Sequence, residues 1–211
     1  MPSLLQPTEV RQLLDLVQDQ PGSTPVFLDL LREIKERVVR TIDADPLVAE
    51  RLAGARHRLI DIEFREEEQK VANAEVSVRL AEAVIYDYDR SVVVVAVTDL
   101  RAGVVESIFE RQGVQPALTA EEREEALDIV LSDERYETVR SRGPIRFTAL
   151  PAPAAQVEGG PLFGHRLFLL RFWSDDRSPV RVAQAAVDLS TREVVAVDEA
   201  QSVTSGGQSP A

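Results

Sequence analysis

An internal repeat constrains this chain more than any other feature, because a duplicated sequence is expected to fold twice into the same kind of unit. Residues 78–91 (VRLAEAVIYDYDRS) align without a gap with residues 165–178 (HRLFLLRFWSDDRS), at an offset of 87. Further along, Asp99-Leu100 recurs as Asp188-Leu189 at an offset of 89. An offset that grows slightly at turns is typical of a duplication with short loop insertions. The sequence therefore predicts two related units in tandem.

Two more matches extend the repeat in both directions. Val104-Val105 aligns with Val194-Val195 at an offset of 90, and Gly54 aligns with Gly143 at an offset of 89. Together the matches divide the chain into four expected segments. These are an N-terminal helix (9–18) with its linker over 1–23, a first unit over 24–112, a second unit over 113–200, and a disordered Gly/Ser-rich tail over 201–211.

In the first unit the pattern predicts helices followed by strands. Thr24 and Pro25 are a typical N-cap and first helical residue, and the apolar residues that follow recur at helical spacing as far as Ile42. Asp45-Pro46 starts a shorter helix that ends near Gly54. From His57 the apolar period changes to two, which indicates a strand. Further strands are expected at 75–87, 91–99 and 103–109, joined by turns short enough for antiparallel hairpins.

The second unit repeats this order. Thr119 and Glu122 fit a capping box at the start of an acidic helix over 120–131. The strands that follow are expected near 144–150, 165–174, 179–188 and 193–198. A helix packed on a four-stranded antiparallel sheet is an α+β unit. The predicted fold class is thus α+β, a tandem duplication of a cystatin-like unit with an extra N-terminal helix.

The composition excludes several classes of function. The chain has no Cys and two His, His57 and His165, so it has no thiol nucleophile and no three-His metal site of its own. A net charge of −12 argues against nucleic acid as a partner. No apolar stretch is long enough to cross a membrane, and no secretory signal is visible, so we expect a cytoplasmic protein without a membrane partner. We expect no cofactor.

A resemblance to a known family covers residues 24–200 and rests on the order of several motifs. Gly113-Val114-Gln115-Pro116 before the acidic helix, the Val-rich stretch 97–105, residues 45–54, and the strand pair 166–173 and 185–195 resemble the N-terminal domains N2 and N3 of copper amine oxidases. The resemblance implies two cystatin-like domains with a docking role. It does not carry over the catalytic chemistry, because that family uses a modified Tyr after Asn and three His copper ligands. Here the single Asn, Asn73, precedes Ala74, so we expect no catalytic residue and no enzyme activity.

The candidate interaction surface consists of acidic residues, which could present an electrostatic docking face to a basic partner. They form two clusters: Glu66, Glu67 and Glu68, and Glu121, Glu122, Glu124 and Glu125. The alternatives for these clusters are a merely solvated face, which is usual for runs of Glu, and paired acid/base carboxylates.

Other polar residues have structural interpretations that we prefer. His57 and His165 are expected to be ordinary polar residues at strand ends rather than ligands. The stretch 86–89 (YDYD) could bind a cation, but Asp89 and its counterpart Asp176 are more simply explained as turn residues. If Arg90 is only a turn residue, Arg90→Ala should lower the free energy of unfolding by less than about 1 kcal/mol. Trp173 aligns with Tyr86 and is expected in the core.

Three functional hypotheses remain open at this stage. The first is a non-catalytic assembly module whose partner is another protein, such as a separately encoded amine-oxidase-type catalytic subunit, or a second copy of itself. The second is a small-molecule binder or enzyme that uses the concavity between sheet and helix, or the cleft between the repeats. The third is a peptidase-inhibitor-like module that presents residues 151–164 as its loop.

Overall fold

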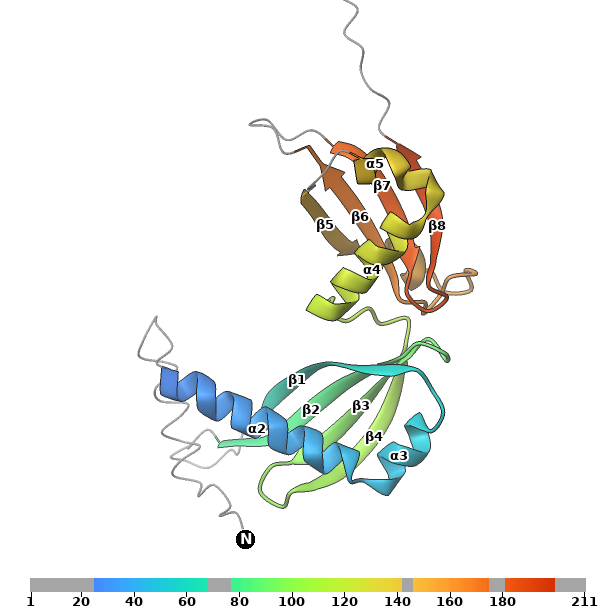
Figure 1. Ribbon diagram of the computed structural model, residues 1–211. Helices are drawn as coiled ribbons and strands as arrows, with labels where there is room; N and C mark the ends of the chain where they lie inside the picture. Colours follow the sequence, from blue (N-terminus) through green and yellow to red (C-terminus); the bar gives the residue numbers. More distant parts are fainter. Residues whose placement is uncertain (1–24, 68–76, 142–145, 175–180, 200–211) are drawn as a thin grey trace, which may run out of the picture. The chain divides into compact units, whose positions relative to one another are not determined.

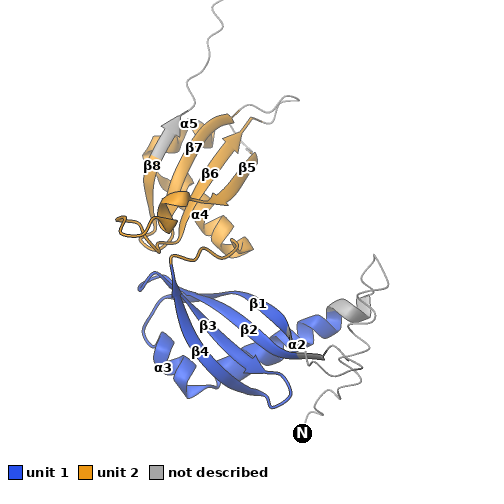
Figure 2. Ribbon diagram, turned by 180° about the vertical axis from the view of Figure 1, so that it is seen from behind, with its two compact units in different colours: residues 1–112 blue, residues 113–211 orange. Residues whose placement is uncertain are grey.

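The computed structural model describes residues 25–67, 77–141, 146–174 and 181–199 (Figure 1). The expected helix over 9–18, the N-cap Thr24, Glu68, Asp176 and the expected tail lie outside these residues. The chain divides between Gln112 and Gly113 into two compact units (Figure 2). Within the described residues, no helix is both long and apolar enough to cross a membrane.

In the first unit, two helices precede a four-stranded antiparallel sheet, and the long helix crosses one face of that sheet (Figure 1). The strands follow one another in the sheet in their chain order. The elements are α2 (Pro25–Asp43), α3 (Pro46–Leu52), β1 (His57–Glu67), β2 (Ser77–Asp87), β3 (Val92–Asp99) and β4 (Val104–Gln112). Asp45 caps α3, since its Oδ1 accepts hydrogen bonds from the amides of Leu47 and Val48.

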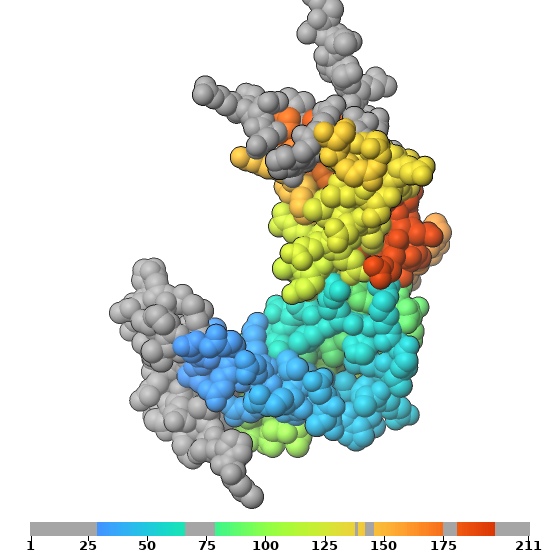
Figure 3. All heavy atoms as spheres, in the orientation of Figure 1, coloured from blue at the N-terminus to red at the C-terminus, as the bar shows by residue number. Residues whose placement is uncertain are grey.

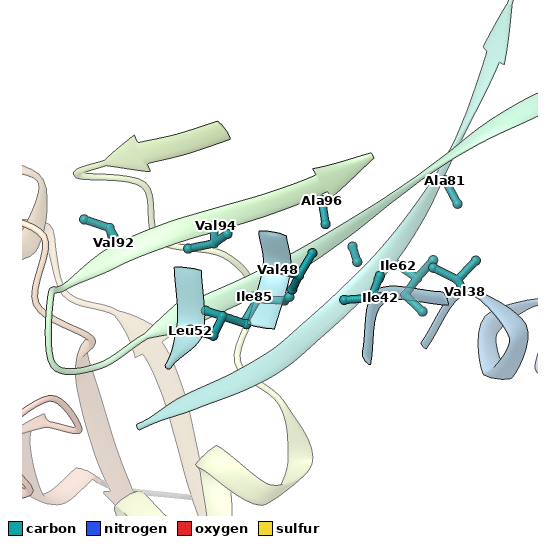
Figure 4. Packing of buried hydrophobic residues seen from close by; sticks show 11 residues of the cluster. Val38, Ile42, Val48, Leu52, Ile62, Ala81, Ile85, Val92, Val94 and Ala96 are labelled. Carbon is teal, nitrogen blue, oxygen red and sulfur yellow. The ribbon is translucent and has the colours of Figure 1, made fainter. Parts of the chain in front are cut away.

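The core of this unit lies between the two helices and the sheet (Figure 4). Strand β3 runs through the middle of the sheet, and all eight of its side chains are buried. The residues that form the core come from both helices and from three strands: Val38, Ile42, Val48, Leu52, Ile62, Ala81, Ala83, Ile85, Val92, Val94 and Ala96. The small side chains of Ala81 and Ala83 on β2 therefore face the helices.

The second unit has the same plan with shorter helices (Figure 1). Its sheet is again antiparallel with the strands in chain order. The elements are α4 (Ala120–Ser132), the 3₁₀ turn η1 (Glu134–Tyr136), α5 (Glu137–Ser141), β5 (Arg146–Pro151), the 3₁₀ turn η2 (Pro153–Gln156), β6 (Leu167–Trp173), β7 (Arg181–Asp188) and β8 (Glu193–Glu199). The capping box predicted for α4 is present, with Thr119 and Glu122 bonded reciprocally to each other's backbone amides.

The two sheets confirm the duplication at the level of individual hydrogen bonds. Leu80 pairs with Asp99 in the first sheet, and Leu167 pairs with Asp188 in the second. At the residue before each pair, the Arg79 carbonyl accepts from the Leu100 amide at 2.9 Å, and the Arg166 carbonyl accepts from the Leu189 amide at 2.8 Å. The sequence offsets of 87 and 89 therefore mark equivalent positions in the two ladders.

One of the sequence matches is wrong by a single residue. Val104 pairs with Asp99, and the residue that pairs with Asp188 is Glu193, so the offset stays at 89 after this turn instead of growing to 90. Both turns end in a left-handed residue, Gly103 with φ of 67° and Arg192 with φ of 63°. The turn has the same length and the same backbone conformation in both units. The alignment of Val104-Val105 with Val194-Val195 rested only on the identity of the side chains.

Candidate functional site

A groove runs between helix α2 and strand β1 on the surface of the first unit (blue and cyan in Figure 3). It encloses about 720 Å³. Leu31 and Val39 of α2 form its apolar wall on the helix side, and Leu59 and Ile60 of β1 form the opposite wall. An apolar hollow beside the first strand of a sheet is a surface on which another chain can pack.

A β-bulge shapes the strand wall of this groove. Leu59 pairs with Ile85 of β2, but the next pair joins Asp61 to Val84, so Ile60 is the extra residue of β1. A bulge bends its strand and redirects one side chain. Here the extra residue is an isoleucine that lines the groove.

One ion pair spans the groove from helix to strand. Lys35 Nζ lies 3.2 Å from Asp61 Oδ1, and both side chains are about half exposed, at 44% and 54%. An exposed pair of this kind contributes little to stability. Beside the pair, the apolar side chains of both walls stay at least partly exposed.

Strand β1 is also an edge strand. It has eleven residues and pairs with β2 on one side, while among the described residues no strand pairs with its other side. An unpaired edge presents backbone N–H and C=O groups that can accept another strand. The opposite edge of the same sheet, β4, is lined largely by exposed polar and charged side chains.

A second hollow adjoins the groove, beneath α2 and α3 and above β1 and β2. This cavity has a volume of about 360 Å³, opens to solvent, and shares Val39 and Leu59 with the groove. Ile42, Val48, Ala49, Leu52 and Ile85 provide the rest of its apolar lining, and its polar lining is Asp43, His57 and Arg58.

His57 lies at the rim of this cavity and is exposed. Its Nδ1 is 2.9 Å from the Ala55 carbonyl oxygen, so this nitrogen carries the hydrogen and Nε2 is the acceptor in the neutral ring. His165, by contrast, lies in the second unit, where its Nδ1 is 2.6 Å from Oδ2 of the buried Asp188. Both histidines stand at strand ends. No cluster of three His, Asp or Glu that could hold a metal is found in the described ranges.

The acidic residues of the first cluster are not all described. Glu66 and Glu67 are the last two residues of β1, paired with Val78 and Ser77, so they end a strand rather than form a loop. Glu68 lies outside the described residues.

Three residues of the second acidic cluster, Glu121, Glu124 and Glu125, line one surface hollow, and Glu122 does not. Glu121 and Glu124 of α4 are exposed and Glu125 is partly buried, with its Oε1 3.5 Å from Nε of Arg192. Glu122 is fully buried, and its Oε2 lies 2.7 Å from Nη2 of the equally buried Arg166. Glu122 is therefore no part of a docking face. It faces inward because the capping box fixes its side chain toward the helix start.

The turn between β2 and β3 is organised by Asp87 rather than by Asp89. Oδ1 of the buried Asp87 accepts hydrogen bonds from the amides of Asp89 and Arg90, both at 3.0 Å. Asp89 instead accepts from the amide of Arg56 at 2.8 Å and so fastens the start of β1. In an Asx turn, the Asp side chain accepts a hydrogen bond from the amide two residues further along the chain. Asp87 stands two residues before Asp89, so its position in the sequence fits this role.

The tyrosines of the stretch 86–89 do not form an open cation site. Tyr86 and Tyr88 are buried, with ring centroids 5.1 Å apart and an edge-on arrangement. The guanidinium of Arg56 lies 4.3 Å from the centre of the Tyr88 ring, so a side chain of the protein already occupies that face.

The expected counterparts Tyr86 and Trp173 do correspond. Arg58 pairs with Tyr86, and Arg146 pairs with Trp173. Tyr86 is a core residue as expected, whereas Trp173 is only partly buried. The difference follows from its place at the last residue of β6, at the end of the sheet.

Residues 151–164 do not form a free loop. Ala152 and Ala155 are buried and pack with Leu162 and Leu167 in a small cluster of their own. Only parts of the segment, such as Val157 at 58% exposure, face solvent. This anchoring disfavours an inhibitor loop that must enter a protease cleft.

No protein-family model and no curated protein matches the chain.

Proposed function

We propose that this protein is a non-catalytic assembly module that associates with a second copy of itself through strand β1. The observation that carries the proposal is the unpaired edge of β1, eleven residues long, beside an apolar groove. Strand addition uses such an edge for backbone hydrogen bonds and the neighbouring hollow for side chains.

The sequence of β1 is complementary to itself in one antiparallel register. When two copies pair about a centre between Ile60 and Asp61, Arg58 of each copy lies opposite Glu63 of the other. In the same register, Leu59 lies opposite Ile62. Opposite charges across a strand pair stabilise it, and like charges destabilise it.

The bulge makes this register sterically consistent. Arg58 pairs with Tyr86 and Glu63 pairs with Glu82, so both side chains lie on the same face of the sheet despite their odd spacing. Residues that oppose each other in an antiparallel pair must share a face. Without the extra residue Ile60, Arg58 and Glu63 would lie on opposite faces.

Light scattering on the full chain after size exclusion, over a range of protein concentrations, tests this proposal. We expect a dimer for the wild type, dissociation for Glu63→Arg, which places Arg opposite Arg, and recovery in the double variant Arg58→Glu/Glu63→Arg. Ser107→Arg on the exposed edge strand β4 is the matched control and should leave the dimer intact. A wild-type monomer at all concentrations would overturn the proposal.

We propose in addition that each unit is cystatin-like, on the ground that a helix crosses one face of a four-stranded antiparallel sheet in both. The resemblance to the N2 and N3 domains of copper amine oxidases adds a competing partner, an amine-oxidase-type catalytic chain. Affinity purification of the tagged protein from its source cells distinguishes the two partners. Stoichiometric recovery of such a catalytic chain would replace self-association with hetero-assembly.

A further inference from the structure

We propose that the cavity beneath α2 and α3 is a binding site for a small aromatic molecule with a hydrogen-bond donor. The inference goes beyond assembly and does not depend on it, because it rests on a comparison between the two units of the chain.

Strand β2 contributes Ile85 to the lining of the cavity. Strands β2 and β6 correspond at an offset of 87, as their ladder partners show. On the face toward the helices, β6 carries the large buried side chains Phe168, Leu170 and Phe172. The corresponding residues of β2 are smaller at every position: Ala81, Ala83 and Ile85.

The neighbouring strands differ in the same direction. Because Arg58 and Arg146 have equivalent partners, Leu59 of β1 corresponds to Phe147 of β5. The first unit therefore has no aromatic ring at this position, whereas the second does.

In the second unit, these rings fill the space over the end of the sheet. The ring centroids of Phe147 and Phe172 are 6.2 Å apart, and those of Tyr136 and Phe172 are 6.1 Å apart. In the first unit the counterparts of Phe147 and Phe172 are Leu59 and Ile85, and both line the cavity. The cavity thus lies where the other unit holds an aromatic cluster.

The size and lining of the cavity define the ligand. An engineered apolar cavity of about 150 Å³ in another protein holds benzene. The present cavity of about 360 Å³ therefore has room for a compound of two fused rings. Its lining is mostly apolar, as in small-molecule sites generally.

His57 supplies the polar contact at the rim. Since its Nδ1 donates to the Ala55 carbonyl, Nε2 can accept a hydrogen bond from a ligand N–H or O–H. Indole has two fused rings and one N–H donor, and it is the probe we choose. 1-Methylindole has the same rings without the donor.

The experiment is calorimetric titration of the full chain with each probe. We expect one molecule of indole per chain, bound more tightly than 1-methylindole. In His57→Ala the preference should disappear, so that both probes bind with the affinity that 1-methylindole has for the wild type. Failure of indole to bind the wild type would overturn the proposal.

Filling the cavity gives the decisive variants. Ile85→Phe introduces the ring that the second unit has at this position, and it should weaken indole binding at least tenfold while the melting temperature is kept or raised. If this variant does not fold, Leu59→Phe at a 37% exposed position provides the same test. Leu150→Phe, at an exposed position of the second unit, is the matched control and should bind indole as the wild type does.

Two results of the filling experiment would contradict the proposal. Unchanged indole affinity in folded Ile85→Phe or Leu59→Phe would place the probe elsewhere on the protein. Equal loss of binding in Leu150→Phe would show that any added aromatic ring has the same effect.

Discussion

Arg166 and Glu122 form an ion pair in which both side chains are completely buried, with Nε 2.8 Å from Oε1 and Nη2 2.7 Å from Oε2. The guanidinium also donates to the carbonyl oxygens of Pro116 and Ala117 and lies 4.6 Å from the centre of the Phe168 ring. Since Glu122 caps α4 and Arg166 directly precedes β6, the pair fastens the beginning of the helix to the sheet.

Removal of one partner of this pair should strongly destabilise the protein. Glu122→Ala leaves the Arg166 charge buried without its carboxylate, and we expect a loss of about 3–5 kcal/mol in the free energy of unfolding. Urea denaturation measures it. Thr119→Ala, which removes only the other half of the capping box, should cost about 1 kcal/mol. A loss for Glu122→Ala no larger than for Thr119→Ala would show that the ion pair is dispensable.

The structure changes the expectation for Arg90. Its Nε donates to Oδ2 of the buried Asp87 at 2.7 Å, its Nη1 to Glu110 at 2.6 Å, and its Nη2 to the Arg51 carbonyl at 3.2 Å. Truncation to alanine leaves the Asp87 carboxylate buried without this donor, so we expect a loss of about 2–3 kcal/mol rather than less than 1.

Arg101 offers a matched control for this experiment. It occupies the exposed turn between β3 and β4, where its backbone amide, not its side chain, donates to Asp99. Arg101→Ala should therefore change the free energy of unfolding by less than about 0.5 kcal/mol. Equal losses for the two arginine variants would show that Arg90 is only a turn residue after all.

The protein should lose stability in acid through three carboxyl groups. The amide of Ala102 and then Arg79 lower the pKa of Asp99, and Arg90 lowers the pKa of Glu110, while burial opposes both shifts. Hydrogen bonds from Arg135 lower the pKa of Asp133 from 3.8 to about 2. Each lowered pKa means that the unfolded chain binds more protons than the folded one in acid.

The direction of the pH effect follows from this difference. The contribution is complete above the unfolded pKa values, at about pH 5 and higher, and it is lost as the pH falls toward 2. Urea denaturation at several pH values should show the free energy of unfolding falling over that range. Asp133→Asn should flatten the slope, and an unchanged slope in this variant would assign the effect to other groups.

One core truncation in each unit tests its packing: Val93→Ala in the first unit and Leu167→Ala in the second. Leu167 is 2% exposed and Val93 is 1% exposed. We expect a loss of about 2–5 kcal/mol for Leu167→Ala and a smaller loss, about 1–3 kcal/mol, for Val93→Ala, measured by urea denaturation. Leu150→Ala, at a position 46% exposed, should cost far less. A small loss at Leu167 would indicate that the space collapses around it.

Much of the fold could be predicted because its signals are local. The repeat, the change of period at His57 and the capping box of Thr119 and Glu122 depend only on residues near one another in the chain. One prediction is wrong because it relied on the identity of the side chains and not on the length of the turn before them. The paired valines at 194–195 were matched by type, although the turn before them had kept its length.

The candidate site could be predicted less well because it depends on contacts between distant residues. The groove forms only because α2 and β1 lie next to each other in the folded chain. The cavity forms where Ile85, the counterpart of Phe172, lies beneath residues of α2 and α3. From the sequence we expect a concavity between sheet and helix as a class of site, but the candidate residues that its pattern indicates are the acidic clusters.

Glu122 illustrates the division most clearly. Its role in capping a helix can be predicted from the sequence, as can the repeat and the order of helices before strands in each unit, because these properties follow from spacing along the chain. The tertiary structure alone decided that Glu122 is buried against Arg166, 44 positions away. It also decided that a cavity lies beside Ile85, where the second unit has Phe172, because burial and unfilled volume arise only when separate segments pack together.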